Sequence, residues 1–145
     1  MSRSPDGTPP EVSPAHGTPA TGSVTGLLYR RFVCAARYSW LGLTACFRHE
    51  EAFRFELFLG VILLPLAFLI AETLTDLSLL LGSMLIVLIT ELLNSAVEAV
   101  VDLIGPERSE LAGRAKDQGS AAVLLSMAVF LLIWGAVIGQ RWFGV

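Results

Sequence analysis

This chain is organised around the stretch Glu91-Leu-Leu-Asn-Ser-Ala-Val-Glu-Ala-Val-Val-Asp102. Within that apolar run, Glu91, Asn94, Glu98 and Asp102 follow one another at intervals of three or four residues. A helix turns about 100° per residue, so these four side chains fall within about 80° of one another. The stretch therefore predicts an apolar helix that carries a single polar stripe on one face.

The stripe continues an uncharged run from Leu77 to Thr90, which is long enough to reach well into a bilayer. The 145-residue chain is 54% hydrophobic and 16% charged, with a mean hydropathy of +0.66. Such a composition is typical of an integral membrane protein and excludes an ordinary soluble domain. Because ionisable groups are costly inside a membrane, they usually face a partner, a cavity or a bound cation.

Three segments are predicted to span the membrane. The first is uncharged only from Leu57 to Ala71, whereas a span needs about 20 residues. Its helix must therefore begin near Glu51 and take Arg54 and Glu56 into its first turns, where Arg54 would pair with Glu50. We expect spans at about 51–71, 77–104 and 118–140, within a membrane-embedded domain of residues 26–145.

The N-terminal quarter has a different character. Residues 1–25 are rich in Pro, Ser, Thr and Gly, which predicts a disordered tail. Residues 27–48 predict a basic amphipathic helix, with Arg30, Arg37 and Arg48 on one side. Beside a membrane span such a helix is expected in the headgroup plane, and the alternative is a helix packed on protein.

The distribution of basic residues predicts the topology. Arg and Lys precede the first span and lie between the second and third, whereas the 72–76 turn contains neither. By the positive-inside rule, the N-terminus and the 105–117 loop lie in the cytoplasm. We therefore expect a multi-pass protein of the cytoplasmic (inner) membrane. No nucleic-acid partner is expected, and Cys34 and Cys46 are predicted to be free thiols.

This topology brings the charged groups to one depth. Glu50 opens the first span, the polar stripe rises toward the same face, and the third span opens with further charges: Glu110, Arg114, Lys116 and Asp117. Carboxylates beside cations suit a magnesium ion with the phosphates of a nucleotide. Glu91 is the deepest acid and is the natural general base for an alcohol dissolved in the lipid.

Two other interpretations remain open from the residues alone. The acids could pair with Arg114 and Lys116 and only hold helices together. Alternatively, one membrane glutamate could bind a cation or a proton, as in a small drug/proton antiporter. Three acids on one stripe exceed what an antiporter needs, and the Arg/Lys group has no part in carrying organic cations.

The polar stripe resembles the signature of the prokaryotic diacylglycerol kinase family. Three further segments resemble other motifs of that family: Tyr38-Ser39-Trp40, Glu51-Ala52-Phe53-Arg54 and Gly113-Arg114-Ala115-Lys116-Asp117-x-Gly119-Ser120-Ala121-Ala122-Val123. The resemblance implies an all-α membrane fold, with one amphipathic surface helix and three transmembrane helices, assembled as a homotrimer with composite sites between protomers. It also implies transfer of the ATP γ-phosphate to diacylglycerol, with Mg²⁺, to give phosphatidic acid.

The resemblance implies roles for individual residues. Glu91 is similar to the catalytic base, and Glu50 and Glu98 are similar to metal ligands that also contact ATP. The further ATP-contacting positions are Arg31, Tyr38, Glu107, Arg108, Ser109, Lys116 and Asp117. The lipid-substrate positions are Trp40, Arg54, Glu56, Glu91, Ser120 and Trp134, with Asn94, Asp102 and Arg114 in support.

Two features concern the exact branch of the family. The 107–109 loop reads Glu-Arg-Ser, where relatives carry an aromatic residue and a histidine. Undecaprenol kinases share the fold and the Glu91 motif, so phosphorylation of undecaprenol is the alternative activity. The Phe53-Arg54 pair and the segment from Gly113 to Ser120 favour the diacylglycerol branch.

Overall fold

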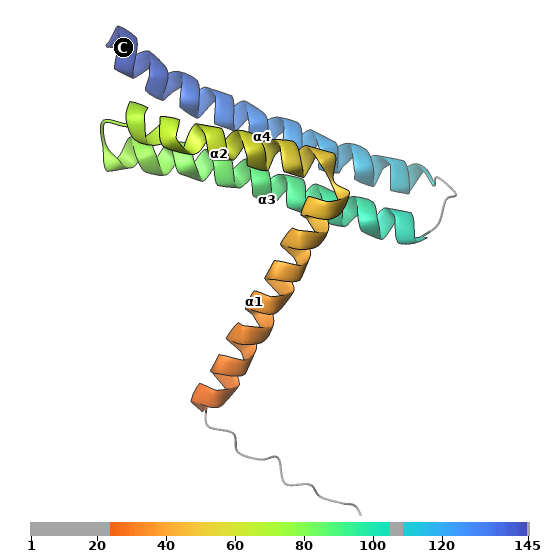
Figure 1. Ribbon diagram of the computed structural model, residues 1–145. Coiled ribbons are helices and arrows are strands. Elements are labelled where there is room, and N and C mark those ends of the chain that lie inside the picture. Colours follow the sequence, from red (N-terminus) through yellow and green to blue (C-terminus); the bar gives the residue numbers. More distant parts are fainter. Residues whose placement is uncertain (1–23, 105–108, 145) are drawn as a thin grey trace, which may run out of the picture. The chain divides into compact units, whose positions relative to one another are not determined.

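The computed structural model describes residues 24–104 and 109–144, and every regular element in this part is a helix. The four helices are α1 (Val24–His49), α2 (Glu51–Ile70), α3 (Leu74–Ile104) and α4 (Glu110–Phe143) (Figure 1). The predicted all-α fold is confirmed. The chain divides into two compact units at Ala36 and Arg37, so that α1 contributes residues to both.

The described part of the first unit is the beginning of α1, up to Ala36. Its described side chains are exposed, including Arg31 and Cys34. The placement of this helix on a membrane surface stays a prediction, and residues 1–23 of the predicted tail lie outside the described residues.

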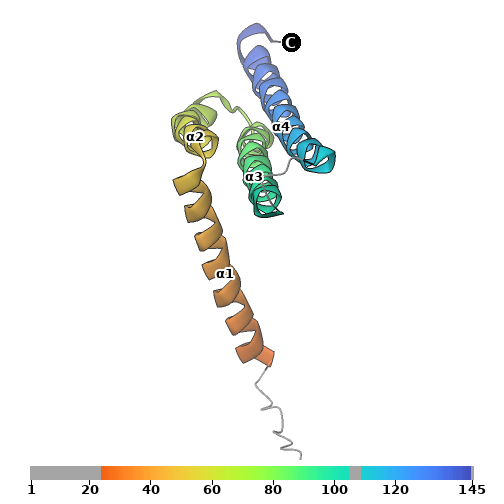
Figure 2. The same ribbon diagram turned by 90° about the vertical axis from the view of Figure 1, so that its right-hand side faces the viewer.

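The second unit is built on α2, α3 and α4. Helix α3 lies between the other two and packs most extensively against α4, as Figure 2 shows. One cluster of buried side chains joins all three helices: Ala67, Ile70, Leu80, Trp134 and Val137. We call this cluster the apolar end of the bundle.

All three of these helices are long and apolar enough to cross a membrane, and the chain is a multi-pass membrane protein. Helix α2 has 20 residues and begins at Glu51, so Arg54 and Glu56 do lie in its first turns. It continues through Pro65. Helices α3 and α4 have 31 and 34 residues, which is more than the roughly 20 that a span requires.

Side-chain caps set the starts of the last two helices. Before α3, the backbone N–H of Thr73 donates to Asp76 Oδ2 at 2.9 Å, and the N–H of Asp76 donates to Thr73 Oγ1 at 3.1 Å. This reciprocal pair is a capping box. It makes Leu74 to Asp76 helical, where the sequence predicted part of a turn. Before α4, Ser109 Oγ accepts from the N–H of Ala112 at 3.1 Å.

The apolar end is also joined at its surface. Arg141, near the end of α4, donates to Glu72 Oε1 at 2.5 Å, and Glu72 lies in the turn between α2 and α3. Trp134 packs on Phe130 with ring centroids 5.3 Å apart. The indole Nε1 of Trp134 is buried without a hydrogen-bond partner.

Candidate active site

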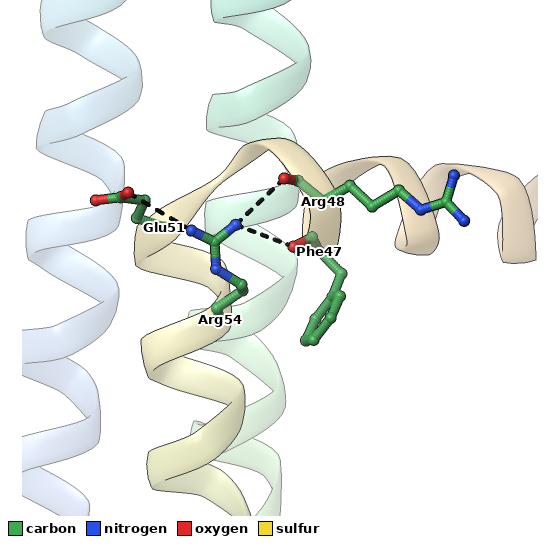
Figure 3. A network of polar contacts seen from close by, with 4 residues as sticks. All are labelled: Phe47, Arg48, Glu51 and Arg54. Carbon is green, nitrogen blue, oxygen red and sulfur yellow. Dashed lines mark hydrogen bonds and ion pairs between the residues drawn. The ribbon is translucent and has the colours of Figure 1, made fainter.

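The corner between α1 and α2 is held by Arg54. Its guanidinium Nη1 donates to the backbone oxygens of Phe47 at 3.3 Å and Arg48 at 3.2 Å, and its Nη2 lies 3.6 Å from Glu51 Oε1 (Figure 3). The last carbonyls of a helix have no partner within that helix, and Arg54 satisfies two of them. Arg54 therefore fixes the start of α2 against the end of α1.

This geometry corrects the predicted pair between Glu50 and Arg54. Across residues 24–104 and 109–144, the ion pair that Arg54 makes is with Glu51. Glu50 caps α2 from outside the helix, in an extended conformation with φ −107° and ψ 118°. The spacing of four residues aligns two side chains only when both are helical. Glu50 is therefore free of that pair and is half-buried at the end of the polar stripe.

Glu91 is the most buried acid of the stripe, with 5% of its surface exposed. One helical turn later, Ser95 Oγ donates to the backbone oxygen of Glu91 at 3.0 Å. The thiol of Cys46, from the end of α1, lies 3.5 Å from Ser95 Oγ. This chain of contacts holds the end of α1 to α3 at the level of Glu91.

The pKa of the Cys46 thiol depends on the charges around it. Burial raises the pKa of its thiol, and the nearby carboxylates of Glu50, Glu91 and Glu56 raise the pKa further, whereas the hydrogen bond to Ser95 opposes them. Cys46 is a free thiol, as the sequence predicted. It lies at a point where three acids of α2, α3 and the α1–α2 corner come together.

Three acids of the predicted convergence, Glu50, Glu91 and Glu98, lie near one another, and Glu56 joins them. Glu50 and Glu98 lie close enough to Glu91 for their charges to act on it, and Glu91 acts in the same way on Glu56. Glu56 is 9% exposed, and both of its carboxylate oxygens are buried without a hydrogen-bond partner. Asn94 Nδ2 donates to Glu98 Oε1 at 3.2 Å, so the amide of the stripe orients its neighbouring acid.

The last acid of the stripe contacts α4. Asp102 Oδ1 lies 2.7 Å from Lys116 Nζ, and this ion pair joins the end of α3 to the beginning of α4. Arg114 and Asp117 are exposed on the same helix start. We call this part of the bundle the polar end. It extends from Glu50 and Glu91 to the ion pair between Asp102 and Lys116.

The acids fit a magnesium ion that is completed by a nucleotide. Among the described residues, no three His, Cys, Asp or Glu side chains gather as a closed metal site. Magnesium does not require one, because it usually takes one or two carboxylates together with phosphate oxygens and water. Glu50 and Glu98, which both lie near Glu91, supply that number of carboxylates.

Two apolar hollows lie between the helices of the second unit. One, of about 490 Å³, lies between the end of α1, α2 and α3, and Trp40, Phe53 and Leu92 are among its lining residues. The other, of about 250 Å³, lies between α2, α3 and α4, and Glu56 is the one charged residue in its lining. Both hollows are therefore suited to hydrocarbon, and the second presents a buried carboxyl to it.

The remaining predicted site residues are distributed unevenly. Tyr38 and Trp40 are exposed, and Trp40 reaches the larger hollow. Ser109 caps α4, Ser120 is exposed, and Trp134 lies in the apolar end rather than with the acids. Arg31 belongs to the first unit, and Glu107 and Arg108 lie outside the described residues.

Three residues at the polar end were not singled out from the sequence. Ser95 carried a local signal, because a serine four residues after Glu91 can bond to that residue's carbonyl. The small residues that begin at Gly119 predicted a close approach between helices, but not its partner Asn94, which is 25 positions away in the chain. Cys46 carried no signal, since its contact is 49 positions away. Only the packing of the helices identifies them.

The sequence is similar to known kinases over most of its length. A model of the prokaryotic diacylglycerol kinase family matches residues 37–138. The diacylglycerol kinase of Haemophilus influenzae is 48% identical over 114 residues, which cover 79% of this chain and 95% of that one. The diacylglycerol kinase of Escherichia coli strain K12 is 50% identical over 111 residues, which cover 73% of this chain and 87% of the relative. The diacylglycerol kinase of Pseudomonas aeruginosa is 42% identical over 114 residues, which cover 79% of this chain and 91% of the relative.

Proposed function

The chain belongs to the prokaryotic diacylglycerol kinase family, and we propose that it transfers the γ-phosphate of ATP to the free hydroxyl of diacylglycerol, giving phosphatidic acid. The observation that carries the proposal is the buried Glu91, which lies near other acids, one of which, Glu56, lines an apolar hollow. A base at that place can reach an alcohol that never leaves the membrane.

Glu91 is the general base in this proposal. The hydroxyl oxygen of the lipid forms a bond to the γ-phosphorus, the bond from that phosphorus to the bridging oxygen breaks, and ADP leaves with the electron pair. The hydroxyl proton passes to the Glu91 carboxylate. The backbone of Glu91 is held by Ser95, which supports a fixed position for the base.

Glu50 and Glu98 would hold Mg²⁺ together with the phosphates. The ion supplies charge stabilisation for the phosphates during transfer. Asn94 supports this assignment, because its amide donates to Glu98 Oε1 and leaves the other carboxylate oxygen available.

The nucleotide contacts are proposed from the beginning of α4 and the end of α1. Lys116 would neutralise phosphate charge, and its ammonium already pairs with the carboxylate of Asp102. Binding would therefore exchange one anion for another at Lys116. Further contacts are proposed for a set that extends outside the described bundle: Arg31, Tyr38, Glu107, Arg108, Ser109 and Asp117.

The lipid is proposed to lie along the two hollows. Trp40 lines the larger one, and Glu56 lines the smaller one with two unsatisfied oxygens that would accept hydrogen bonds from the glycerol end. Arg54 and Ser120 are proposed to contact the headgroup region. Phe130 lines the smaller hollow, and Trp134 packs against its ring. Trp134 is therefore proposed to contact the lipid deeper in the membrane.

We also propose that the enzyme works as a homotrimer in the cytoplasmic membrane, with its N-terminus in the cytoplasm. At most 22% of the most apolar window of each spanning helix is buried within one chain, so much apolar helix surface is available to lipid or to further copies. Composite sites between protomers would supply charged groups that one chain does not bring to the acids. The positions of Arg and Lys support the orientation.

The proposal is tested by the substrate. Purified protein in mixed micelles with Mg²⁺ and γ-labelled ATP is offered diacylglycerol, undecaprenol or triacylglycerol, which has no free hydroxyl. We expect labelled phosphatidic acid from diacylglycerol, far slower labelling of undecaprenol and none of triacylglycerol. Equal or faster labelling of undecaprenol would assign the chain to the alternative branch, and no labelled lipid at all would overturn the proposal.

A further inference from the structure

Helices α3 and α4 approach each other closely at Asn94 and Gly119. A Cβ atom built at position 119 would overlap Asn94 Oδ1 and would lie 3.3 Å from Asn94 Cγ. The nearest backbone atom of α3, Asn94 Cα, would be 3.8 Å away, which is ordinary van der Waals contact. The backbones therefore leave room for a methyl group at position 119, and only the amide of Asn94 occupies that space.

The amide of Asn94 has a hydrogen-bond partner at one end only. Its Nδ2 donates to Glu98 Oε1 at 3.2 Å, and its Oδ1 is buried beside Gly119 with no hydrogen-bond donor. A buried carbonyl oxygen without a donor is costly, so the amide keeps this orientation for another reason. The bond to the Glu98 carboxylate is the interaction that it gains.

From these contacts we propose that Gly119 is a positioning residue for Glu98, acting through Asn94. The absence of a side chain at position 119 lets the amide stand where it can donate to Glu98, and so sets the carboxylate that receives the metal. This inference rests on the proposed function, because it takes Glu98 as a ligand of the magnesium–nucleotide complex. It adds a residue from α4 to a site built on α3.

A methyl group at position 119 would disturb the amide rather than the helices. The terminal torsion of an asparagine is soft, so the amide can rotate away from an added Cβ at small cost. That rotation takes Nδ2 away from Glu98. Alanine also favours a helix interior over glycine. Gly119→Ala should therefore leave the fold intact while it releases the Glu98 carboxylate.

The first experiment compares Gly119→Ala with Gly135→Ala and Gly139→Ala. All three glycines lie in α4, and a Cβ at either control position meets nothing within 4 Å. The readouts are turnover against Mg²⁺ concentration, and the Mg²⁺ concentration at which ATP protects the protein from thermal unfolding. For Gly119→Ala alone, we expect both Mg²⁺ midpoints to rise about 10- to 100-fold, with the unfolding temperature of the metal-free protein unchanged or raised.

The second experiment is a double-mutant cycle with Asn94→Ala, which removes the amide and opens the space. If Gly119 acts through Asn94, Gly119→Ala should change the Mg²⁺ midpoint by less than about twofold in the Asn94→Ala background. Equal effects of Gly119→Ala in both backgrounds would overturn the inference. So would a fall in unfolding temperature that matches the loss of activity, since that result describes ordinary helix packing.

The two proposals fail in different ways. If the wild-type protein labels no lipid, the proposed function fails, and the thermal protection by ATP and Mg²⁺ still measures whether Gly119 affects metal binding. If the wild-type protein is active and Gly119→Ala matches Gly135→Ala and Gly139→Ala in both midpoints, the role of Gly119 fails and the kinase proposal stands.

Discussion

The polar end and the apolar end of the bundle are built from the same three helices on opposite principles. At the apolar end, the buried side chains are hydrocarbon or aromatic, and Leu80 is 0% exposed. At the polar end, the buried groups include Glu56 and Glu91, and the oxygens of Glu56 have no donor within the described residues. Among the described residues, the apolar end leaves one buried polar atom without a partner, Trp134 Nε1, whereas the polar end leaves both carboxylate oxygens of Glu56 and the amide oxygen of Asn94.

The difference indicates that the polar end serves activity and the apolar end serves stability. Buried carboxylates without partners reduce stability, and they persist in proteins where a ligand or a reaction uses them. Well-packed hydrocarbon side chains contribute stability but have no groups that can bind a polar ligand or take part in a reaction. We therefore expect substitutions at the polar end to change activity more than stability, and substitutions at the apolar end to do the reverse.

The largest expected effect is at Glu91. Glu91→Gln keeps the size of the side chain and removes the proton acceptor, so turnover should fall by roughly 10²- to 10⁴-fold. ATP affinity and unfolding temperature should change little, because Ser95 bonds to the Glu91 backbone and Cys46 bonds to Ser95, so neither contact involves the Glu91 carboxylate. An active variant, or one that aggregates, would return Glu91 to a role in holding helices together.

The next effect tests the apolar end. Leu80→Ala leaves a cavity in the cluster shared by α2, α3 and α4, and such truncations typically cost about 2–5 kcal/mol of stability. The remaining folded protein should keep its turnover per molecule. Leu79→Ala is the matched control, because Leu79 is 47% exposed and should cost far less. The check is thermal unfolding in detergent together with activity per folded molecule.

A smaller effect is expected at the corner between α1 and α2. Arg54→Met removes the donors to the carbonyls of Phe47 and Arg48, a loss of about 1 kcal/mol per hydrogen bond for groups that water can also reach. Proteolysis of α1 should become faster, and turnover should fall because Cys46 and Glu50 lie at this corner. Arg48→Met is the control, since Arg48 takes part through its backbone oxygen.

The smallest effect is at the outer surface of the apolar end. Glu72→Gln breaks the ion pair with Arg141, whose partners are both about half exposed. Pairs of that kind are worth about 0.2–1 kcal/mol, and salt screens them. We expect a slightly lower unfolding temperature at low salt, no difference at high salt and unchanged turnover. A large loss of turnover would show that the two ends are coupled.

Sequence alone was sufficient where the signal is local. The spacing from Glu91 to Asp102 placed the acids on one face of a helix, and charge-free runs located the three apolar helices. The capping box of Thr73 and Asp76 is also a local signal, a Thr followed three residues later by an acid, but it was missed and residues 72–76 were predicted as a turn, so α3 begins earlier than expected.

Sequence was insufficient where the fold decides. Spacing paired Arg54 with Glu50, but the break between α1 and α2 falls at Glu50 and gave the pair to Glu51. The contact of Gly119 with Asn94 depends on the distance between α3 and α4, and the periodicity of the sequence does not give that distance. Trp134 was assigned to the lipid site by resemblance, and its position in the apolar cluster follows only from tertiary packing.

The division between the two ends is tested most directly by one crossed measurement. Turnover and unfolding temperature are determined in the same detergent for wild type, Glu91→Gln and Leu80→Ala. We expect Glu91→Gln to lose turnover at an unchanged unfolding temperature, and Leu80→Ala to unfold at a lower temperature with its turnover per folded molecule preserved. If both variants lose turnover and stability together, the polar end is part of the structural core and the two ends are not divided in this way.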